Sequence, residues 1–189
     1  MVLSPKEVVP RSDWVIFSAG IESLVTSIGD SMTDELRARF KAHGVDLSKK
    51  LQAAYPADAW QRCLEDTARH LFPTLTPDEA QRRVGQRFFD GWNGTITGRA
   101  AAAMLRLIGA QRAISRIGRV FRYGNNFTVT EATFDESGAS LVHFLQTQQI
   151  PHFVRGVVES AMVFMNVNGS VTVHAVDAAG FTLRFQLTA

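Results

Sequence analysis

Residues 76–109, TPDEAQRRVGQRFFDGWNGTITGRAAAAMLRLIG, decide the fold of this chain. The stretch opens with a strong helix start. Thr76 can cap the helix, Pro77 suits the first helical position, and Glu79 follows three residues after the cap to complete a capping box. Large apolar side chains then recur on one face, at Val84, Phe88, Phe89 and Trp92. We therefore expect a helix whose apolar face organises the rest of the molecule.

Glycine is unusually frequent within this stretch. Each glycine costs a helix interior about 0.8–1.0 kcal/mol relative to alanine, and four occur here, at Gly85, Gly91, Gly94 and Gly98. Close approach of another backbone would compensate for this cost. A break near residues 93–94, which makes two helices of one, is the alternative. Small side chains at positions 91, 95, 98 and 102 would form a stripe if the helix were continuous.

Composition indicates one globular domain spanning residues 1–189. Hydrophobic residues make up 46% and charged residues 20% of the chain, as in ordinary globular proteins. Phenylalanine is abundant (13) and tyrosine scarce (2), which favours a deep apolar interior. The one cysteine excludes an intramolecular disulfide, and no Cys/His cluster has zinc spacing, so neither a metal nor a cofactor is expected. No apolar run approaches a membrane span, so we expect a cytoplasmic protein.

Hydrophobic spacing predicts a helical part, about residues 14–122, followed by a sheet part, about residues 123–189. Helices are expected near 21–28, 36–40 and 57–71, with one more short helix after residue 109. Cys63 lies on the apolar stripe of the 57–71 helix and is interpreted as a core thiol. Strands are expected at 127–134, 141–146, 171–176 and 181–187, with a helix at 151–165 between the pairs. The predicted fold class is α+β. Helices are followed by elements in the order β-β-α-β-β, which form an antiparallel sheet covered on one face.

Arginine is concentrated between residues 82 and 122, where nine arginines accompany a single acidic residue. Arg112, Arg116 and Arg119 have the spacing of one helix face. A solvated surface is the favoured interpretation, and a docking patch for an anionic partner is the alternative. Aromatic side chains that could stack on bases are scarce there, so a nucleic-acid partner is not expected.

Catalytic motifs are absent from the sequence: there is no GxSxG, HExxH, GxxxxGK[ST] or GxGxxG. The five histidines stand apart from any nucleophile motif. His143 and His174 fall in predicted strands and could approach each other, although two ordinary strand residues are the simpler interpretation. Asn125 and Asn126 fit a turn, because asparagine tolerates turn geometry. We therefore expect no enzymatic activity.

Several motifs resemble known families. The succession VDLSKKLQAAYP, Trp60, LFPTLTPDEAQRRVGQRFFDGW, TITGRAAAAMLRLIG and FRYGNNFT is similar to a paralogous family of unknown function found in myxobacteria. The C-terminal half resembles vinyl-reductase-type domains, which belong with TRAPP-like and haem–nitric-oxide-binding domains to a ligand-binding superfamily. This resemblance implies an apolar pocket between helices and sheet, and frequently dimers. The C-terminal cysteines of vinyl-reductase-type domains and the YxSxR haem signature are both missing.

These observations predict a non-enzymatic ligand-binding or regulatory domain that holds a hydrophobic small molecule. One alternative is a protein–protein interaction or adaptor module with a solid core, and another is an accessory protein or enzyme of specialised metabolism. The candidate pocket residues are the following: Phe88, Trp92, Phe127, Phe153, Val157, Leu183 and Phe185. A homodimer is also predicted, buried through the helices around residues 21–28 and 36–40.

Overall fold

A computed structural model describes residues 8–188, apart from the side chains of residues 96, 97, 105 and 106. The helical part contains β1 (Val15–Phe17), α1 (Ser18–Ile28), α2 (Asp34–Ala42), β2 (Ala54–Pro56), α3 (Ala57–Leu71), α4 (Pro77–Asn93), α5 (Ile96–Ile108), α6 (Ala110–Ser115) and α7 (Ile117–Phe121), with short 3-10 turns at Arg11–Asp13 and Gly29–Ser31. The sheet part contains β3 (Val129–Phe134), β4 (Ser140–Gln146), α8 (Pro151–Phe164), β5 (Gly169–Val176) and β6 (Phe181–Leu187).

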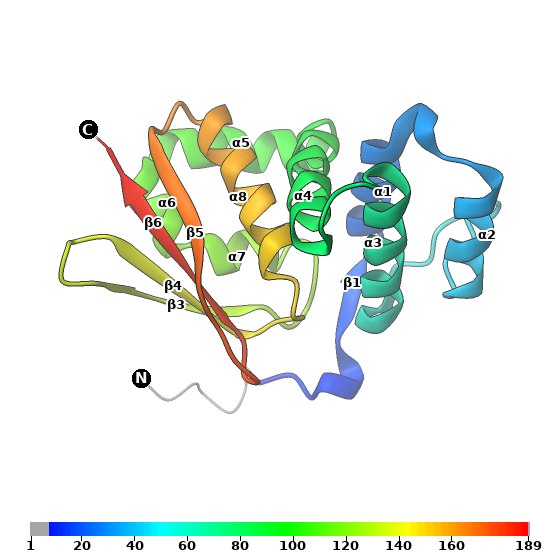
Figure 1. Cartoon of the computed structure of the whole chain (residues 1–189), viewed down its shortest axis with the longest axis horizontal. Helices are drawn as coiled ribbons and strands as arrows, with labels where there is room; N and C mark the ends of the chain where they lie inside the picture. Colours follow the sequence, from blue (N-terminus) through cyan, green and yellow to red (C-terminus); the bar gives the residue numbers. More distant parts are fainter. Residues whose placement is uncertain (1–7, 189) are drawn as a thin grey trace.

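The sheet is antiparallel throughout, in the order β3-β4-β6-β5. Its centre is apolar on one face, where Val142 of β4 pairs with Leu183 of β6 and both side chains are fully buried. In Figure 1, α8 lies between the sheet and α4, with α1 and α3 on the far side of α4. The β-β-α-β-β order predicted from the strand patterns is therefore confirmed.

The central stretch forms two helices, and both explanations for its glycines hold at different positions. α4 ends at Asn93, and Thr95 starts α5 by accepting a hydrogen bond from the Gly98 amide at 2.9 Å. Gly85 meets α8: a Cβ there would collide with the carbonyl of Phe153. A Cβ at Gly91 would lie 2.6 Å from the carbonyl oxygen of Ser23 in α1. The break means that the predicted stripe of small side chains does not lie on one continuous helix.

The start of α4 is capped by Thr76, whose hydroxyl accepts a hydrogen bond from the Glu79 amide at 3.4 Å. The Glu79 carboxylate does not complete the capping box. It instead accepts hydrogen bonds from Arg82 at 2.8 Å and Arg83 at 3.0 Å, because two guanidinium groups are within its reach. Burial alone would raise the pKa of Glu79, but these two arginines outweigh it and the pKa lies below its ordinary value.

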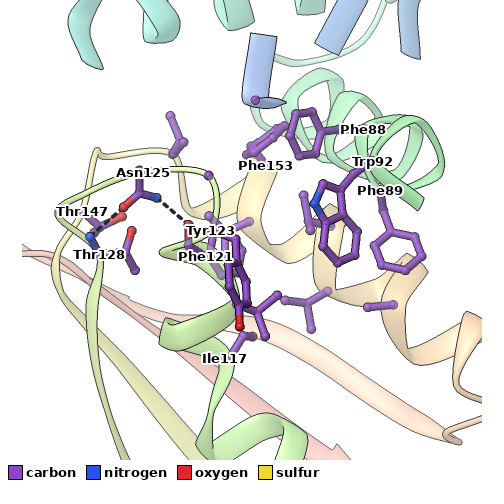
Figure 2. A pocket seen from close by; sticks show the side chains of 18 of the residues that line it. Phe88, Phe89, Trp92, Ile117, Phe121, Tyr123, Asn125, Thr128, Thr147 and Phe153 are labelled. Atoms are coloured by element: carbon purple, nitrogen blue, oxygen red, sulfur yellow. Dashed lines mark hydrogen bonds between the residues drawn. The ribbon is translucent and has the colours of Figure 1, made fainter. Parts of the chain in front are cut away.

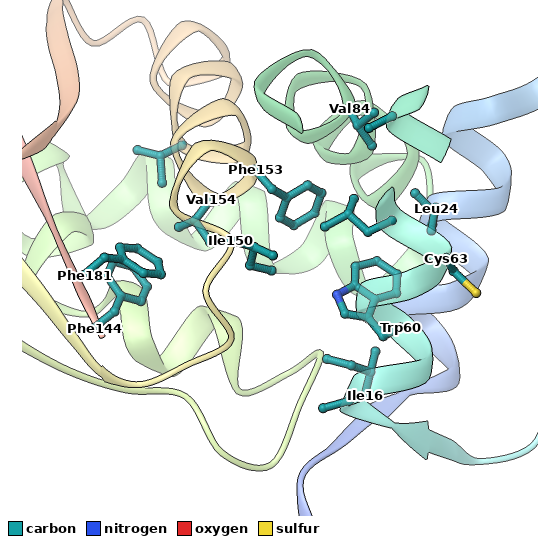
Figure 3. Close-up of a cluster of buried hydrophobic side chains, with 14 of the residues drawn as sticks. Ile16, Leu24, Trp60, Cys63, Val84, Phe144, Ile150, Phe153, Val154 and Phe181 are labelled. Atoms are coloured by element: carbon teal, nitrogen blue, oxygen red, sulfur yellow. The ribbon is translucent and has the colours of Figure 1, made fainter. Parts of the chain in front are cut away.

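The amino-terminal helices pack into the core of the single chain. Their apolar faces are almost fully buried against α3 and α4, at Ile21, Leu24, Ile28, Leu36 and Phe40. Figure 3 shows Leu24 of α1 near Cys63 of α3, within the same buried cluster. The apolar residues expected to form a dimer interface are therefore covered inside one chain, and the predicted interface is wrong in its residues. Homodimerisation itself stays a prediction.

Candidate functional site

An apolar cavity of about 160 Å³ lies between the helical part and the sheet part. One side is formed by α4 and α8, and the other by α6, α7 and the loop that leads into β3. The exposed lining residue Tyr123, with 57% of its surface accessible, lies where the cavity reaches the outside. Figure 2 shows Phe88, Phe89, Trp92 and Phe153 grouped on one side of this space, and Asn125, Thr128 and Thr147 on the other, beside Phe121 and Tyr123.

The aromatic side of the cavity is a packed cluster. Phe88 of α4 meets Phe153 of α8 edge to face, with ring centroids 5.2 Å apart, and Trp60 of α3 packs against both rings at 5.7 and 6.0 Å. Edge-to-face pairs at such distances are favourable beyond the area that they bury. Phe89 and Trp92 continue this wall along α4. The every-fourth-residue spacing of the α4 sequence thus builds one rigid wall.

The opposite wall comes from two short helices, α6 and α7. Five apolar side chains of these helices line the cavity: Ala113, Ile114, Ile117, Val120 and Phe121. The helices are separated at Arg116, whose backbone (φ −111°, ψ 8°) leaves the helical region. The sequence predicted one short helix after residue 109, and the break at Arg116 makes it two.

The polar side of the cavity is held together by Asn125. Its side-chain oxygen accepts hydrogen bonds from the amides of Phe127 at 3.1 Å and Thr128 at 2.8 Å, and its amide group donates to the carbonyl of Phe121 at 3.1 Å. Next along the chain, Asn126 accepts a hydrogen bond from the Val15 amide at 2.9 Å. The two asparagines therefore fix the loop to α7 and β1, as expected of a turn, and one of them also faces the cavity.

Gln148 joins the polar side to the start of α3. It is 4% exposed, and its amide nitrogen donates to the carbonyl of Ala57 at 2.6 Å and to the side-chain oxygen of Gln61 at 3.3 Å. The Val129–Gln146 pair at the start of the β3–β4 ladder brings Thr128 into the neighbourhood of residues 147 and 148. The polar side is thus assembled from segments far apart in the sequence.

Six of the seven predicted pocket residues line this cavity: Phe88, Trp92, Phe127, Phe153, Val157 and Phe185. Leu183 does not line it, because its side chain is fully buried against the middle of the sheet. Residues of α6, α7 and the polar side were not predicted. Two sequence signals lie near them, the apolar spacing of the short helix after residue 109 and the Gly-Asn-Asn turn, and both predict local structure without indicating a pocket.

The charged side chains lie elsewhere. None of the described lining residues is Asp, Glu, Lys, Arg or His. Arg112, Arg116 and Arg119 are exposed, but the break at Arg116 places them on α6, between the helices and on α7, so the prediction of one helix face is wrong. Over the described part of the chain, no group of three or more His, Cys, Asp or Glu side chains has the arrangement of a metal site.

The local environments of His143 and Cys63 are consistent with structural roles. His143 contacts the hydroxyls of Thr133 at 2.9 Å and Thr182 at 3.0 Å, across the outer face of the sheet. Cys63 is fully buried, and this burial, aided by the charge of Asp66, raises the pKa of its thiol to about 12. A thiol in this state is a poor nucleophile, which is consistent with the interpretation of Cys63 as a core residue.

Comparisons with known proteins bear on the fold. A family model described as "Protein of unknown function (DUF2378)" matches residues 15–188. Comparison with curated protein sequences gave no match. Among the helices of residues 8–188, none is both long enough and apolar enough to span a membrane.

Solved structures with similar folds are H-NOX proteins. A doubly substituted Tt H-NOX protein has a TM-score of 0.70 and 11% identity, over 92% of this chain and 96% of that one. An H-NOX protein from S. oneidensis in the Fe(II)NO ligation state has a TM-score of 0.68 and 8% identity, over 92% of this chain and 100% of that one. A third, from work on haem distortion in the H-NOX family, has a TM-score of 0.66 and 12% identity, over 90% and 94% of the two chains. The haem–nitric-oxide-binding-like fold predicted from the sequence is confirmed, and at these identities the likeness concerns the fold alone.

Proposed function

The chain belongs to the DUF2378 family of proteins of unknown function, and from that premise we propose that it is a non-enzymatic regulatory domain that holds a hydrophobic small molecule. The observation that supports the proposal is the apolar cavity of about 160 Å³ between α4, α8 and α6–α7. Ligand sites are typically concave and mostly apolar, with a few polar groups that orient the ligand. The cavity also favours this proposal over an interaction module with a solid core.

The architecture of the cavity suggests how a ligand would act. One wall, α4 with α8, is held by close backbone contact and by an ion pair between Arg82 and Glu159 at 2.7 Å. The other wall is made of two short helices, α6 with six residues and α7 with five. Gly109, which has a positive φ, precedes α6, and the break at Arg116 separates α6 from α7. A ligand that contacts both walls would restrict the short helices more than the long ones. Binding would then be reported by the α5–α7 segment.

The H-NOX structures with a similar fold suggest haem as a ligand. The described residues of the cavity are not suited to bind haem. The cavity is smaller than the roughly 300–1,000 Å³ typical of sites for drug-sized ligands, and haem is at least as large as such ligands. Its described lining offers no histidine or cysteine to the iron, and its two methionines, Met162 and Met165, have no histidine to complete a Met/His pair. It also offers no cationic side chain to the two haem carboxylates. The tyrosine in the lining, Tyr123, lies at the exposed mouth. We therefore derive no function through haem.

The proposal is tested by extracting natively purified protein with organic solvent and identifying bound molecules by mass spectrometry. We expect an apolar compound in stoichiometric amount with the wild type. Ala161→Phe, which adds a ring to a cavity-lining position of α8, should lose the compound. Val163→Phe is the matched control, because Val163 is on the same helix but 76% exposed. An empty wild-type protein, or equal loading of all three, would reject the proposal.

An interaction module remains a second candidate because of one feature of α5. Met104 and Leu107 on this helix are 60% and 87% exposed. Large apolar side chains exposed together on a helix mark many interaction sites. If the protein binds a partner there, replacing both residues by glutamine should abolish co-purification of that partner and leave the extracted ligand unchanged.

A further inference from the structure

Among the nearly buried residues of the cavity lining, three polar atoms have no hydrogen-bond partner among the described residues: Trp60 Nε1, Thr128 Oγ1 and Gln148 Oε1. Their residues are only 3%, 3% and 4% exposed. The lining side chains of Trp92 and Tyr123 also have no such partner, but both are more exposed. Buried indole N–H and hydroxyl groups normally find partners, because leaving one unpaired costs about 1–3 kcal/mol. A group avoids that cost when it faces water or a ligand, so the space that these three atoms face matters.

The space that these atoms face is the cavity. No side-chain nitrogen or oxygen that is sealed from small molecules lacks a partner among the described residues. The three unpaired atoms are therefore accessible, and the cavity is the open space that their nearly buried residues share. Figure 3 shows the indole nitrogen of Trp60 on the side of the ring that faces Ile150, another lining residue.

The three residues come together at the junction of α3 with the β3–β4 hairpin. Gln148 is tied to Ala57 and Gln61, which flank Trp60 on the first turns of α3. The Val129–Gln146 pair brings Thr128 close to Gln148 along the chain. One indole donor, one hydroxyl and one amide oxygen thus belong to connected segments that line a mostly apolar space.

Resting on the proposed function, we propose that the ligand is a compact, uncharged aromatic molecule with one hydroxyl group, which bonds to Thr128 and Gln148. An uncharged ligand follows from the lining, since burying an unpaired ion is costly and no described lining residue could pair with it. The size follows from the volume, because an apolar cavity of about 150 Å³ accepts benzene. A hydroxyl can donate to Gln148 Oε1 and accept from Thr128 Oγ1, and Trp60 Nε1 supplies a second donor.

The test compares benzene, phenol and benzoate by calorimetric titration of the full chain. Benzene and phenol should bind, and benzoate should not. Thr128→Val removes the free hydroxyl but keeps the side-chain shape and the backbone hydrogen bond to Asn125. We expect this variant to weaken phenol binding relative to benzene binding by about three- to tenfold, as expected for one net hydrogen bond. Thr172→Val on the exposed edge strand β5 is the matched control and should leave both affinities unchanged.

The outcomes separate this inference from the function on which it rests. If benzene and phenol bind but Thr128→Val changes both affinities equally, the hydroxyl contact is wrong and the apolar cavity stands. If benzoate binds as well as phenol, the requirement for an uncharged ligand is wrong. If extraction yields no bound compound, the proposed function itself fails. If a compound is extracted but neither benzene nor phenol binds, the inferred ligand class is wrong and the proposed function stands. Thermal unfolding of Thr128→Val shows whether the variant is folded, and Thr128→Ser, which restores the hydroxyl, should recover the phenol preference.

Discussion

At the scale of single residues, Asp66 on α3 is a nearly buried charge with several partners. Its side chain is 7% exposed and receives hydrogen bonds from His43 at 2.8 Å and Arg69 at 2.7 Å, with Arg39 at 3.6 Å. Burial alone would raise the pKa of Asp66, but the contacts with His43 and Arg69 outweigh burial and hold the pKa below its ordinary value of 3.8. This carboxylate joins the end of α2 to α3.

We predict that Asp66→Asn lowers the free energy of unfolding by about 1.5–3 kcal/mol at pH 7, as for the loss of hydrogen bonds to a charged group. Because the folded pKa is lowered, the contribution of Asp66 is fully present above pH 3.8 and is lost as the pH falls through the folded value. Urea unfolding at pH 7 and near pH 2 should therefore show a large gap between wild type and variant that shrinks in acid. A gap that stays constant with pH would contradict this account.

Helix periodicity and strand alternation predicted which side chains face the interior. They could not predict which of these interior side chains line the cavity. Leu183 and Phe185 share one face of β6 by strict alternation, yet Leu183 is sealed at the sheet centre and Phe185 lines the cavity. The difference depends on what packs over each position, which alternation does not encode. The contacts of Gln148 with α3 span about ninety residues of sequence and leave no local signal.

At the scale of elements, the contact of α4 with α8 depends on paired glycines. A Cβ at Gly85 would collide with the Phe153 carbonyl of α8, and a Cβ at Gly156 would collide with the Arg82 carbonyl of α4. Backbone atoms of packed helices cannot move aside independently. Gly85 and Gly156 therefore set the distance between α4 and α8, the two long helices of one cavity wall.

We predict that Gly85→Ala destabilises the protein by about 1–3 kcal/mol, the usual cost of overpacking. This cost should exceed the gain in helix propensity of about 1 kcal/mol. Gly124→Ala is the control, because its Cβ would find only the Phe121 carbonyl oxygen, at an ordinary 3.5 Å. Thermal unfolding measures the stability of the two variants and the wild type. If Gly85→Ala is as stable as the wild type, α4 and α8 are not in backbone contact.

The arginines illustrate the limit of periodicity at this scale. Spacings of four and three predicted one helix face, but a break of a single residue at Arg116 separates α6 from α7. Such a break hardly disturbs the apolar pattern of Ile114 and Ile117, which both still reach the cavity. The break between α4 and α5 was predictable from the sequence, because it contains helix-breaking residues, Asn93 and Gly94, followed by the N-cap residue Thr95.

We predict that changing Arg112, Arg116 and Arg119 together to glutamine leaves stability nearly unchanged, since exposed substitutions usually cost within about 0.5 kcal/mol. Co-purified proteins should persist in the triple variant and show weak salt dependence. Two results together would contradict the interpretation as a solvated surface: the triple variant folds but loses its partner, and added salt weakens partner binding by the wild type. Those results would favour the interaction module.

At the scale of the whole molecule, the order of elements and the sheet were predictable because alternating strands and apolar helices are local patterns. The spacing of the amino-terminal helices does not distinguish a dimer interface from an internal core, since an apolar helix face has the same pattern in both cases. Here Leu24 and Phe40 are buried within one chain. A homodimer, still predicted from the family resemblance, would form through exposed side chains, and Met104 and Leu107 of α5 are available.

Light scattering at micromolar concentration tests this association. A homodimer should give about twice the chain mass of 20.9 kDa, and Leu107→Gln should shift the mass towards the monomer. A wild-type mass of 20.9 kDa would reject dimerisation. An unchanged dimer in the variant would place the interface elsewhere.

The central claim is that an accessible apolar cavity separates α4 and α8 from α6 and α7. The most direct measurement is a crystal structure determined under xenon pressure, because xenon enters apolar cavities of about this size. We predict xenon density bordered by Trp92, Ile117 and Val157. A map in which side chains fill that space and no xenon binds there would contradict the account.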